Sequence, residues 1–274
     1  MQNALANFRI PNWQCSRYHE RREEASRDFP SAMMSEGMIL KLNDEVVSLG
    51  AQVDATPARR PQRTTLDGRM VKVVPLDPAA HGKALFEGAQ NEQLWIYLFE
   101  GPFTNRASFD SHLKRMASSE DPLFFAILDK TSREAVGYAS YMRIEPTHRV
   151  IEVGSILFTP RLQRTIGATE AMYLMARHVF EDLGYRRYEW KCNALNTPSR
   201  RAALRLGFTF EGVFRQHMII KGRNRDTAWF SILDSEWPKR KAAFERWLDP
   251  GNFDASGRQK VSLFAMNREV ENRG

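Results

Sequence analysis

The pattern of apolar and polar residues divides the chain into three parts. Charged residues dominate positions 17–28, and residues 55–63 carry two prolines and three arginines, as a linker does. Regular apolar patterns begin near Leu66 and continue to about Trp247, after which polar residues prevail. We therefore predict a flexible leader and linker over residues 1–64, one packed domain over 65–248 and a polar tail over 249–274.

The first half of the packed part predicts strands and helices in turn. A short β-branched run at residues 70–76 predicts a strand, and Asp77 with Pro78 then provides an N-cap and a first-turn proline for a helix to about residue 99. A second helix is expected over 105–118. Residues 123–128, 135–144 and 150–158 follow as three strands joined by short turns, which is typical of an antiparallel meander.

After Pro160 the spacing of apolar residues changes to that of a helix. Ala168, Ala171, Met172 and Met175 begin a series at three- and four-residue steps, and Gly184 stands where a helix C-terminus favours glycine. A strand at 188–194, a short helix at 198–206, a strand pair at 208–220 and 227–233, and a helix at 235–247 complete the series. The predicted fold class is α+β, a mixed, mostly antiparallel sheet flanked by helices.

Composition narrows the function classes. The 274 residues are 42% hydrophobic and 27% charged, with a formal net charge of +7. The basic residues are interleaved with acids and form no aromatic-studded stripe, which argues against direct nucleic-acid binding. No apolar run reaches the length of a membrane span or a secretory signal, so we expect a cytoplasmic protein that binds no membrane. Cys15 and Cys192 lie far apart and predict reduced thiols, with no zinc spacing.

One candidate binding segment runs from the strand at 150–158 through a basic loop into a helix. The N-terminus of such a helix presents unpaired N–H groups and the positive end of the helix dipole. Arg161 and Arg164 lie beside it in the sequence. This arrangement suits a diphosphate group. A plain structural turn would have the same pattern.

A second block makes the chain resemble a known family. Asn196 and Pro198 start a helix with Ser199 in its first turn, and Leu206-Gly207-Phe208 and then Glu211-Gly212 follow. Together with the loop 163–168 and the Thr-Glu-Ala that follows it, this block resembles the GNAT superfamily of N-acetyltransferases. The resemblance covers about residues 66–237 and is to the branch that acetylates the N-terminal alanine or serine of ribosomal proteins.

The resemblance implies a GNAT fold, in which the twisted sheet splays into a V that receives acetyl-coenzyme A as co-substrate. Strand backbone would pair with the pantetheine arm, a loop would hold the diphosphate, and Asn196 would contact pantetheine. The loop departs from the family pattern because Ile166 stands where the central glycine is usual. The implied cofactor-binding residues are Ile156, Leu157, Phe158, Gln163, Arg164, Thr165, Ile166, Gly167, Ala168, Thr169, Asn196 and Ser199.

Two residues are the candidates for catalysis. Glu152 interrupts an apolar strand and would be the base that deprotonates an amine, although a solvent-facing or salt-bridged strand residue would give the same pattern. Glu189 is a weaker alternative. The resemblance implies that Ser199 donates a hydrogen bond to the departing thiolate, and the alternative is that it only satisfies the helix end. The histidines lack metal-ligand spacing, and we expect no metal.

These observations predict an acyltransferase that moves an acetyl group from acetyl-coenzyme A to a primary amine on a small molecule or a protein N-terminus. The alternatives are a catalytically silent acyl-coenzyme A-binding regulatory module and a ribosome- or RNA-associated factor. The sequence leaves open the identity of the amine acceptor, and it is compatible with a monomer or a homodimer.

Overall fold

The computed structural model describes residues 39–42 and 45–271, and they belong to two compact units divided after Asp54. Within the first unit, strands β1 (Ile39–Leu42) and β2 (Glu45–Ser48) pair antiparallel. The predicted flexible leader thus contains a strand pair, and its residues 1–38 lie outside the described part. The second unit, from Ala55 onward, holds the sheet and all the sites considered below.

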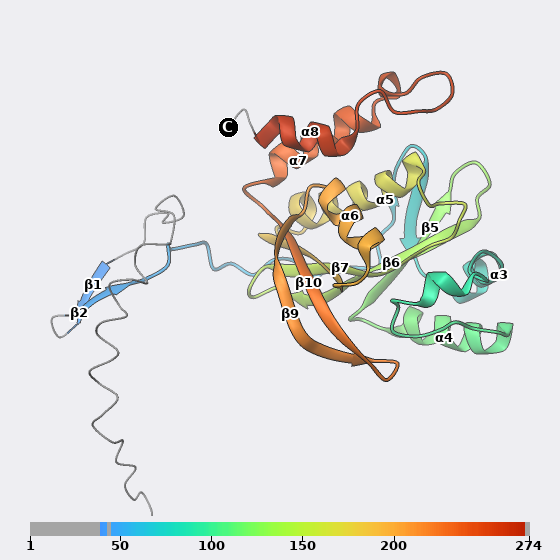
Figure 1. Ribbon diagram of the computed structural model, residues 1–274, viewed down its shortest axis with the longest axis horizontal. Coiled ribbons are helices and arrows are strands. Elements are labelled where there is room, and N and C mark those ends of the chain that lie inside the picture. The colour runs from blue at the N-terminus through green and yellow to red at the C-terminus, as the bar shows by residue number, and fades with distance from the viewer. Residues whose placement is uncertain (1–38, 43–44, 272–274) are drawn as a thin grey trace, which may run out of the picture. The chain divides into compact units, whose positions relative to one another are not determined.

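A single eight-stranded sheet forms the centre of the second unit (Figure 1). Neighbouring strands are antiparallel except β7 and β8, which are parallel. The predicted mixed, mostly antiparallel sheet is therefore confirmed. In spatial order the strands are β3 (Leu66–Asp67), β4 (Val71–Pro75), β5 (Leu123–Asp129), β6 (Ala135–Glu145), β7 (Val150–Phe158), β8 (Arg187–Asn193), β10 (Arg223–Leu233) and β9 (Thr209–Ile220).

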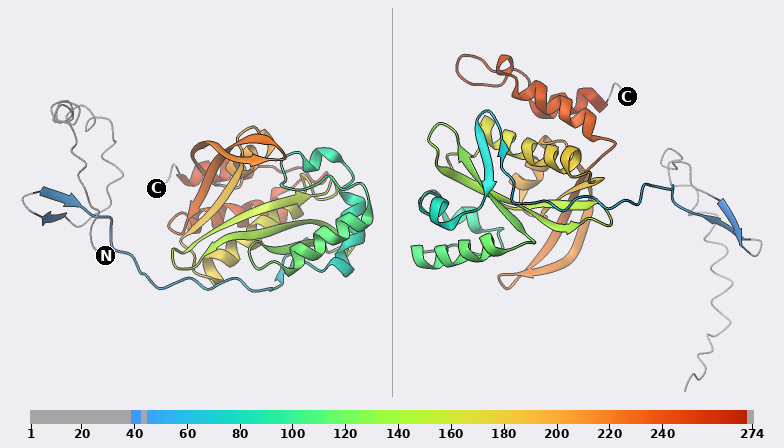
Figure 2. Two further views of the ribbon diagram at one scale, coloured as in Figure 1. Left: turned by 90° about the horizontal axis from the view of Figure 1, so that it is seen from below. Right: turned by 180° about the vertical axis from the view of Figure 1, so that it is seen from behind.

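Helices cover both faces of the sheet and enclose two apolar cores (Figure 2). Alternate residues of β6 show the division, because Tyr141 packs in the larger core and Tyr138 in the smaller one. The smaller core lies under α3 (Pro78–Gly88) and α4 (Arg106–Ser118). The larger core lies under the remaining helices, which are α5 (Ile166–Arg177), α6 (Thr197–Arg205), α7 (Trp237–Leu248) and α8 (Leu263–Glu271).

Strands β7 and β8 diverge along their length. Only Val150–Val153 of β7 pairs with β8, although β7 continues to Phe158. At the point of divergence Ser155 has a φ of 48°, and the register with β6 shifts by one residue, which marks a β-bulge. The second half of β7 therefore faces β8 without ladder hydrogen bonds. This is the V-shaped opening that the resemblance implied.

The structure extends the packed unit beyond the predicted boundaries at both ends. The backbone N–H of Ala58 donates to Pro146 and that of Arg59 to Leu183, so the expected linker already lies on the domain. The expected polar tail contains α8, whose Leu263 and Met266 are 0% and 3% exposed in the larger core. Leu263, Met266 and Val270 stand at three- and four-residue steps, a helical period that is short and lies within an otherwise polar segment.

The helix expected to reach residue 99 ends earlier. α3 stops at Gly88, and a 3₁₀ turn, η3 (Glu92–Trp95), follows with Asn91 as its N-cap and Trp95 buried. After α5, a π-helical turn, η4 (His178–Asp182), leads to Gly184, which has a φ of 77°. A short 3₁₀ turn, η5 (Pro250–Asn252), follows α7. Among the described residues, no helix has the length and apolarity to cross a membrane.

Candidate active site

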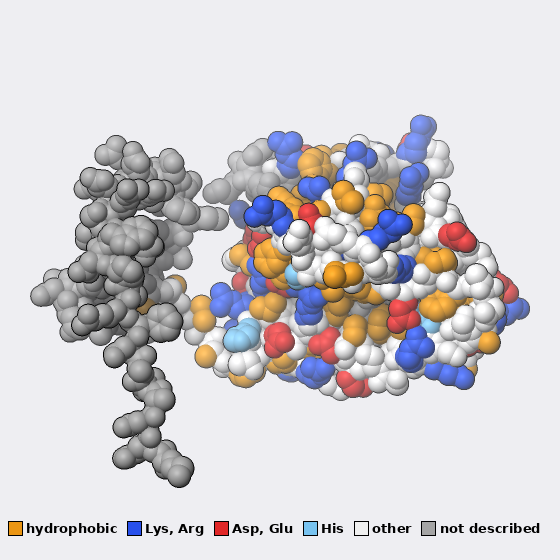
Figure 3. All heavy atoms as spheres, turned by 60° about the horizontal axis from the view of Figure 1, so that its bottom comes forward, with side chains coloured by type: hydrophobic (Ala, Val, Ile, Leu, Met, Phe, Trp, Pro, Cys, Tyr) orange, Lys and Arg blue, Asp and Glu red, His pale blue; other side chains and the backbone are white. Residues whose placement is uncertain are grey.

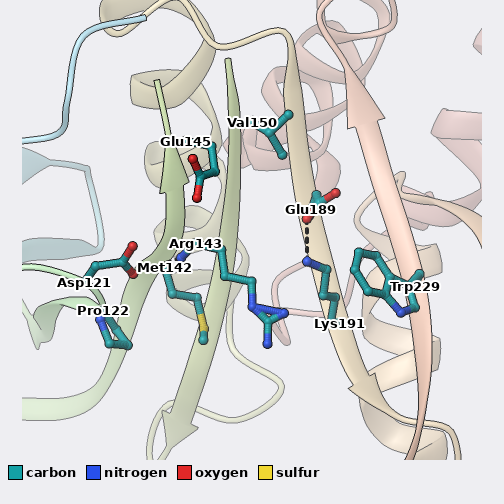
Figure 4. A pocket seen from close by; sticks show the side chains of 9 residues that line it. All are labelled: Asp121, Pro122, Met142, Arg143, Glu145, Val150, Glu189, Lys191 and Trp229. Atoms are coloured by element: carbon teal, nitrogen blue, oxygen red, sulfur yellow. Dashed lines mark hydrogen bonds and ion pairs between the residues drawn. The ribbon is translucent and has the colours of Figure 1, made fainter. Parts of the chain in front are cut away.

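A pocket of about 580 Å³ opens on the sheet face opposite the larger core, next to the point where β7 and β8 diverge (Figure 4). Strands β6, β7, β8 and β10 all contribute to its wall. Acidic, basic and aromatic side chains meet there, a combination suited to a polar, charged ligand. The lining residues are Asp121, Pro122, Met142, Arg143, Glu145, Val150, Glu189, Lys191 and Trp229.

Glu152 lies directly behind this lining. Its neighbours in β7, Ile151 and Val153, point into the larger core, so the alternation of the strand turns Glu152 to the pocket face. Its side chain is only 5% exposed. Arg143 Nη1 and Lys191 Nζ, both of the pocket wall, lie 3.4 Å and 3.1 Å from its Oε2 atom. Of the two interpretations of Glu152, the structure thus shows a salt-bridged residue that also adjoins a pocket.

The environment of Glu152 changes its acidity. Burial raises the pKa of the carboxyl group, and the neighbouring Lys191 and Arg143 cations partly offset this rise. A carboxylate with a raised pKa is a stronger base than one in water. This is the property that a group needs in order to take a proton from an ammonium ion.

Lys191 is the most enclosed cation of the pocket, with a side chain only 4% exposed. Its Nζ lies 2.6 Å from Glu189 Oε2, in addition to the contact with Glu152, and 3.8 Å from the centre of the Trp229 ring. Sequence reasoning missed Lys191. The alternation in residues 188–192 was the available signal, because it places Glu189 and Lys191 on one face of β8 and apolar residues on the other.

Arg143 reaches the pocket from an irregular position in β6. Its φ is 49°, and the register with β7 shifts between Met142 and Glu145. The carboxylate of Asp121 accepts the N–H groups of Arg143 and Ile144 at 2.9 Å and 3.0 Å, which fixes this bulge. The Arg143 side chain remains 37% exposed, and among the residues that the structure describes its one ion pair is the 3.4 Å contact with Glu152. No pattern in the sequence indicated this residue.

Ser199 and Asn196 lie at the N-terminus of α6. Asn196 Oδ1 accepts the N–H of Ser199 at 3.1 Å, so Asn196 is the helix N-cap. The Ser199 hydroxyl accepts a hydrogen bond from Trp190 Nε1 at 3.0 Å, which leaves its own proton to be donated elsewhere. Burial raises the pKa of the nearby Cys192 thiol, and a hydrogen bond with Ser199 opposes that rise. Ser199 does not line the pocket that adjoins Glu152.

The predicted diphosphate loop forms a tight turn into α5. Arg164 has a φ of 60° and an exposed side chain, and Thr165 caps the helix by accepting the N–H of Ala168 at 3.1 Å. Ile166 is the first helical residue, so its N–H and that of Gly167 belong to the unpaired first turn. The exposed Gln163 side chain donates to the carbonyl of Phe158 at 2.8 Å.

Of the remaining predicted cofactor-binding residues, three lie along the opening between β7 and β8, and Thr169 is buried between helices. Ile156, Leu157 and Phe158 belong to the part of β7 that is unpaired with β8. Thr169 is buried and its hydroxyl accepts a hydrogen bond from Arg205 at 3.0 Å, so it joins α5 to α6. The structure therefore turns Thr169 away from the exposed loop.

The acidic and basic side chains outside the pocket follow no single-sign pattern on the surface that Figure 3 shows, where lysine and arginine alternate with acids and apolar groups. His178 lies beside Asp182, and His217 lies beside Thr227. Within the part of the chain that the structure describes, no group of histidine, cysteine and acidic residues could hold a metal ion.

Comparisons with known proteins agree with this architecture. Residues 71–209 match the Acetyltransferase (GNAT) domain family. A crystal structure of a GCN5-related N-acetyltransferase from Brucella melitensis is 50% identical, has a TM-score of 0.76 and aligns over 78% of this chain and 98% of that one.

More distant relatives carry more specific names. The ribosomal-protein-serine acetyltransferase of Escherichia coli K12 is 30% identical over 38% of this chain, and the match spans only 58% of that enzyme's length. The structure of RimL, a ribosomal L7/L12 alpha-N-protein acetyltransferase in complex with coenzyme A, has a TM-score of 0.54 over 62% of this chain and 98% of that one, at 19% identity. At that identity the likeness concerns the fold. From the family match and the Brucella structure, we conclude that the chain belongs to the GNAT acetyltransferase family.

Proposed function

We propose that this protein transfers the acetyl group of acetyl-coenzyme A to a primary amine, with Glu152 as the general base. One observation carries the proposal: a buried carboxylate of raised pKa adjoins a polar pocket where β7 and β8 separate. An amine must lose a proton before it attacks a thioester, and a neighbouring base of suitable pKa performs that step.

The residues around the opening suit acetyl-coenzyme A. The backbone of β7 at Ile156–Phe158 has no partner in β8 and can pair with the amide groups of the pantetheine arm. The first turn of α5 offers N–H groups to the diphosphate, and the exposed Arg164 adds a guanidinium. When bound, the co-substrate supplies a thioester that an amine can attack. Asn196 at the start of α6 would complete the site.

The acceptor amine would enter through the pocket as an ammonium ion. Glu152 holds two cations, and they differ in how firmly they are fixed. Arg143 is partly exposed and touches Glu152 at 3.4 Å, whereas Lys191 is enclosed and closer. The ammonium group would therefore take the place of Arg143 at the carboxylate, which exchanges one cation for another and avoids an unpaired buried charge.

Ser199 would assist the leaving group. Its hydroxyl already accepts from Trp190, so the hydroxyl proton, which now faces the Cys192 sulfur, would be donated to the developing thiolate. We expect Ser199→Ala to lower kcat about 10- to 100-fold and to change the dissociation constant of acetyl-coenzyme A less than about threefold. Steady-state kinetics and calorimetric titration would check this. An equal loss in both quantities would indicate that Ser199 only stabilises the start of α6.

The acceptor class is a primary amine on a protein N-terminus or a small molecule, and the name of the Escherichia coli relative supports the former. The test is calorimetric titration with acetyl-coenzyme A, followed by thiol release with a serine-initiated peptide and with a free polyamine. Binding with acceptor-dependent thiol release supports the enzyme. Binding with no release from any amine would support the silent module instead. Cytoplasmic location and oligomeric state stay predictions.

A further inference from the structure

We propose that Lys191 is a positioning residue for this reaction, whose ammonium group keeps Glu152 ionised and fixed at the pocket wall while the acceptor amine enters. This inference rests on the proposed function of Glu152 as base. Lys191 lies outside the two sequence blocks that carry the family resemblance, and its role follows from three contacts made by one buried cation.

Lys191 has more and closer contacts than Arg143, the other cation of the pocket. Lys191 bridges two carboxylates on neighbouring strands, with Nζ 3.1 Å from Glu152 and 2.6 Å from Glu189, and the Trp229 ring lies against it at 3.8 Å. Figure 4 shows the side chain lying along β8 between Glu189 and Trp229. Three close partners surround this ammonium, whereas Arg143 forms one ion pair within the described part of the chain, at 3.4 Å. Lys191 is thus the cation that stays when an acceptor enters.

Both cations contact the same oxygen of Glu152, Oε2. These contacts are ion pairs, and Oε2 is buried with no hydrogen-bond partner among the residues that the structure describes. Neither ion pair involves the other oxygen, Oε1, whose lone pairs can accept a proton. Lys191 therefore attracts the carboxylate through Oε2 and leaves Oε1 for the proton of the acceptor.

Charges on every neighbouring strand act on Glu152, and their signs give a direction. Arg143 on β6, Lys191 on β8 and Arg225 on β10 favour the ionised form. Glu189 on β8 opposes it, and Met142 and Trp229 are neutral. Burial favours the protonated form. Without Lys191, burial and Glu189 would be opposed only by Arg143 and Arg225 among these groups, and the carboxyl group would hold its proton to higher pH.

The first measurement is an infrared titration of Glu152 in the full-length protein. The absorption of the protonated carboxyl group is isolated by subtracting the spectrum of the same protein carrying Glu152→Gln. We expect Lys191→Met to raise the pH midpoint of this absorption by at least about one unit, since an opposite charge within 4–6 Å shifts a pKa by about 1–3 units. Lys191→Arg should restore most of the wild-type midpoint. An unchanged midpoint in Lys191→Met would overturn the inference.

A double variant tests the same inference with a smaller risk of misfolding. Lys191→Met alone leaves the buried carboxylates of Glu152 and Glu189 without this cation, which can destabilise the fold. Combining Lys191→Met with Glu189→Gln removes both charges of the Lys191–Glu189 ion pair. In this double variant the midpoint should still rise, because Lys191 is the stronger of the two influences on Glu152. A midpoint at or below the wild-type value would contradict the proposal.

Kinetics then connect the titration to the reaction. With one serine-initiated peptide as acceptor throughout, the acid limb of kcat/KM should move to higher pH in Lys191→Met, in step with the infrared midpoint. The infrared result does not depend on turnover, so the two proposals fail separately. A moved midpoint with an unmoved acid limb would refute the positioning role, and an acid limb that survives Glu152→Gln would refute Glu152 as base.

Discussion

Glu152→Gln is expected to lower kcat/KM at least about 100-fold, since a positioned general base contributes roughly 10²- to 10⁴-fold. Glutamine keeps the size of the side chain but cannot accept the ammonium proton. Steady-state rates of thiol release at several pH values would measure the effect. Because burial raises the pKa of Glu152, wild-type activity should increase with pH through that raised pKa, and the variant should lack this increase.

A matched control separates the loss of a base from the loss of any carboxylate. Glu87 is exposed on α3 and lies outside the pocket, so Glu87→Gln should keep the wild-type rate and pH profile. If Glu152→Gln and Glu87→Gln behaved alike, deprotonation of the acceptor would have to be assigned to solvent or to another residue.

The second large effect concerns stability and involves Glu170. This buried carboxylate of α5 accepts three backbone N–H groups, from Arg69, Met70 and Val71, at 2.8 Å, 2.7 Å and 2.9 Å. Glu170→Ala would leave all three donors unsatisfied. We expect it to lower the free energy of unfolding by about 3–5 kcal/mol. The corresponding fall in Tm, measured by calorimetry, is about 10 °C for a domain of this size.

The control for Glu170→Ala is the removal of a carboxylate that forms an ion pair on the surface. Glu134 is exposed and pairs with Arg161, so Glu134→Ala should change the free energy of unfolding by less than about 1 kcal/mol. Similar losses in the two variants would show that the link between α5 and the β3–β4 turn does not stabilise the fold as proposed.

The sequence predicted best those features that depend on neighbouring residues, such as the alternation of a strand or the N-cap of a helix. The alternation of β7 placed Glu152 on the face opposite Ile151 and Val153, and the Asn196 cap and the start of α6 followed from adjacent residues. The contacts of Glu152 could not be predicted in the same way. They depend on the register of β7 against β8 and on the bulge at Arg143, and both are set by pairing between distant segments.

The role of the glycine in the predicted diphosphate loop could not be predicted from the sequence either. Ile166 stands where the family pattern usually has its central glycine. In the structure the helix begins at Ile166, and the neighbouring Gly167 packs against β4, where an added Cβ would lie 2.8 Å from a methyl carbon of Val71. The glycine that remains is therefore required for close packing of helix on strand, a role that spacing alone does not distinguish from phosphate binding.

The contact of helix α8 with α6 changes the expected effect of mutations that truncate the chain near its C-terminus. Asn267 of this helix donates to the carbonyl of Arg205, the last residue of α6, and α6 carries Ser199 at its other end. The family match stops at residue 209, far short of α8. A scoring scheme based on the family alone would rate a frameshift after residue 250 as harmless. Its effect would instead reach α6 through the lost Asn267 contact, and α6 carries Ser199, for which we propose a role at the leaving thiolate.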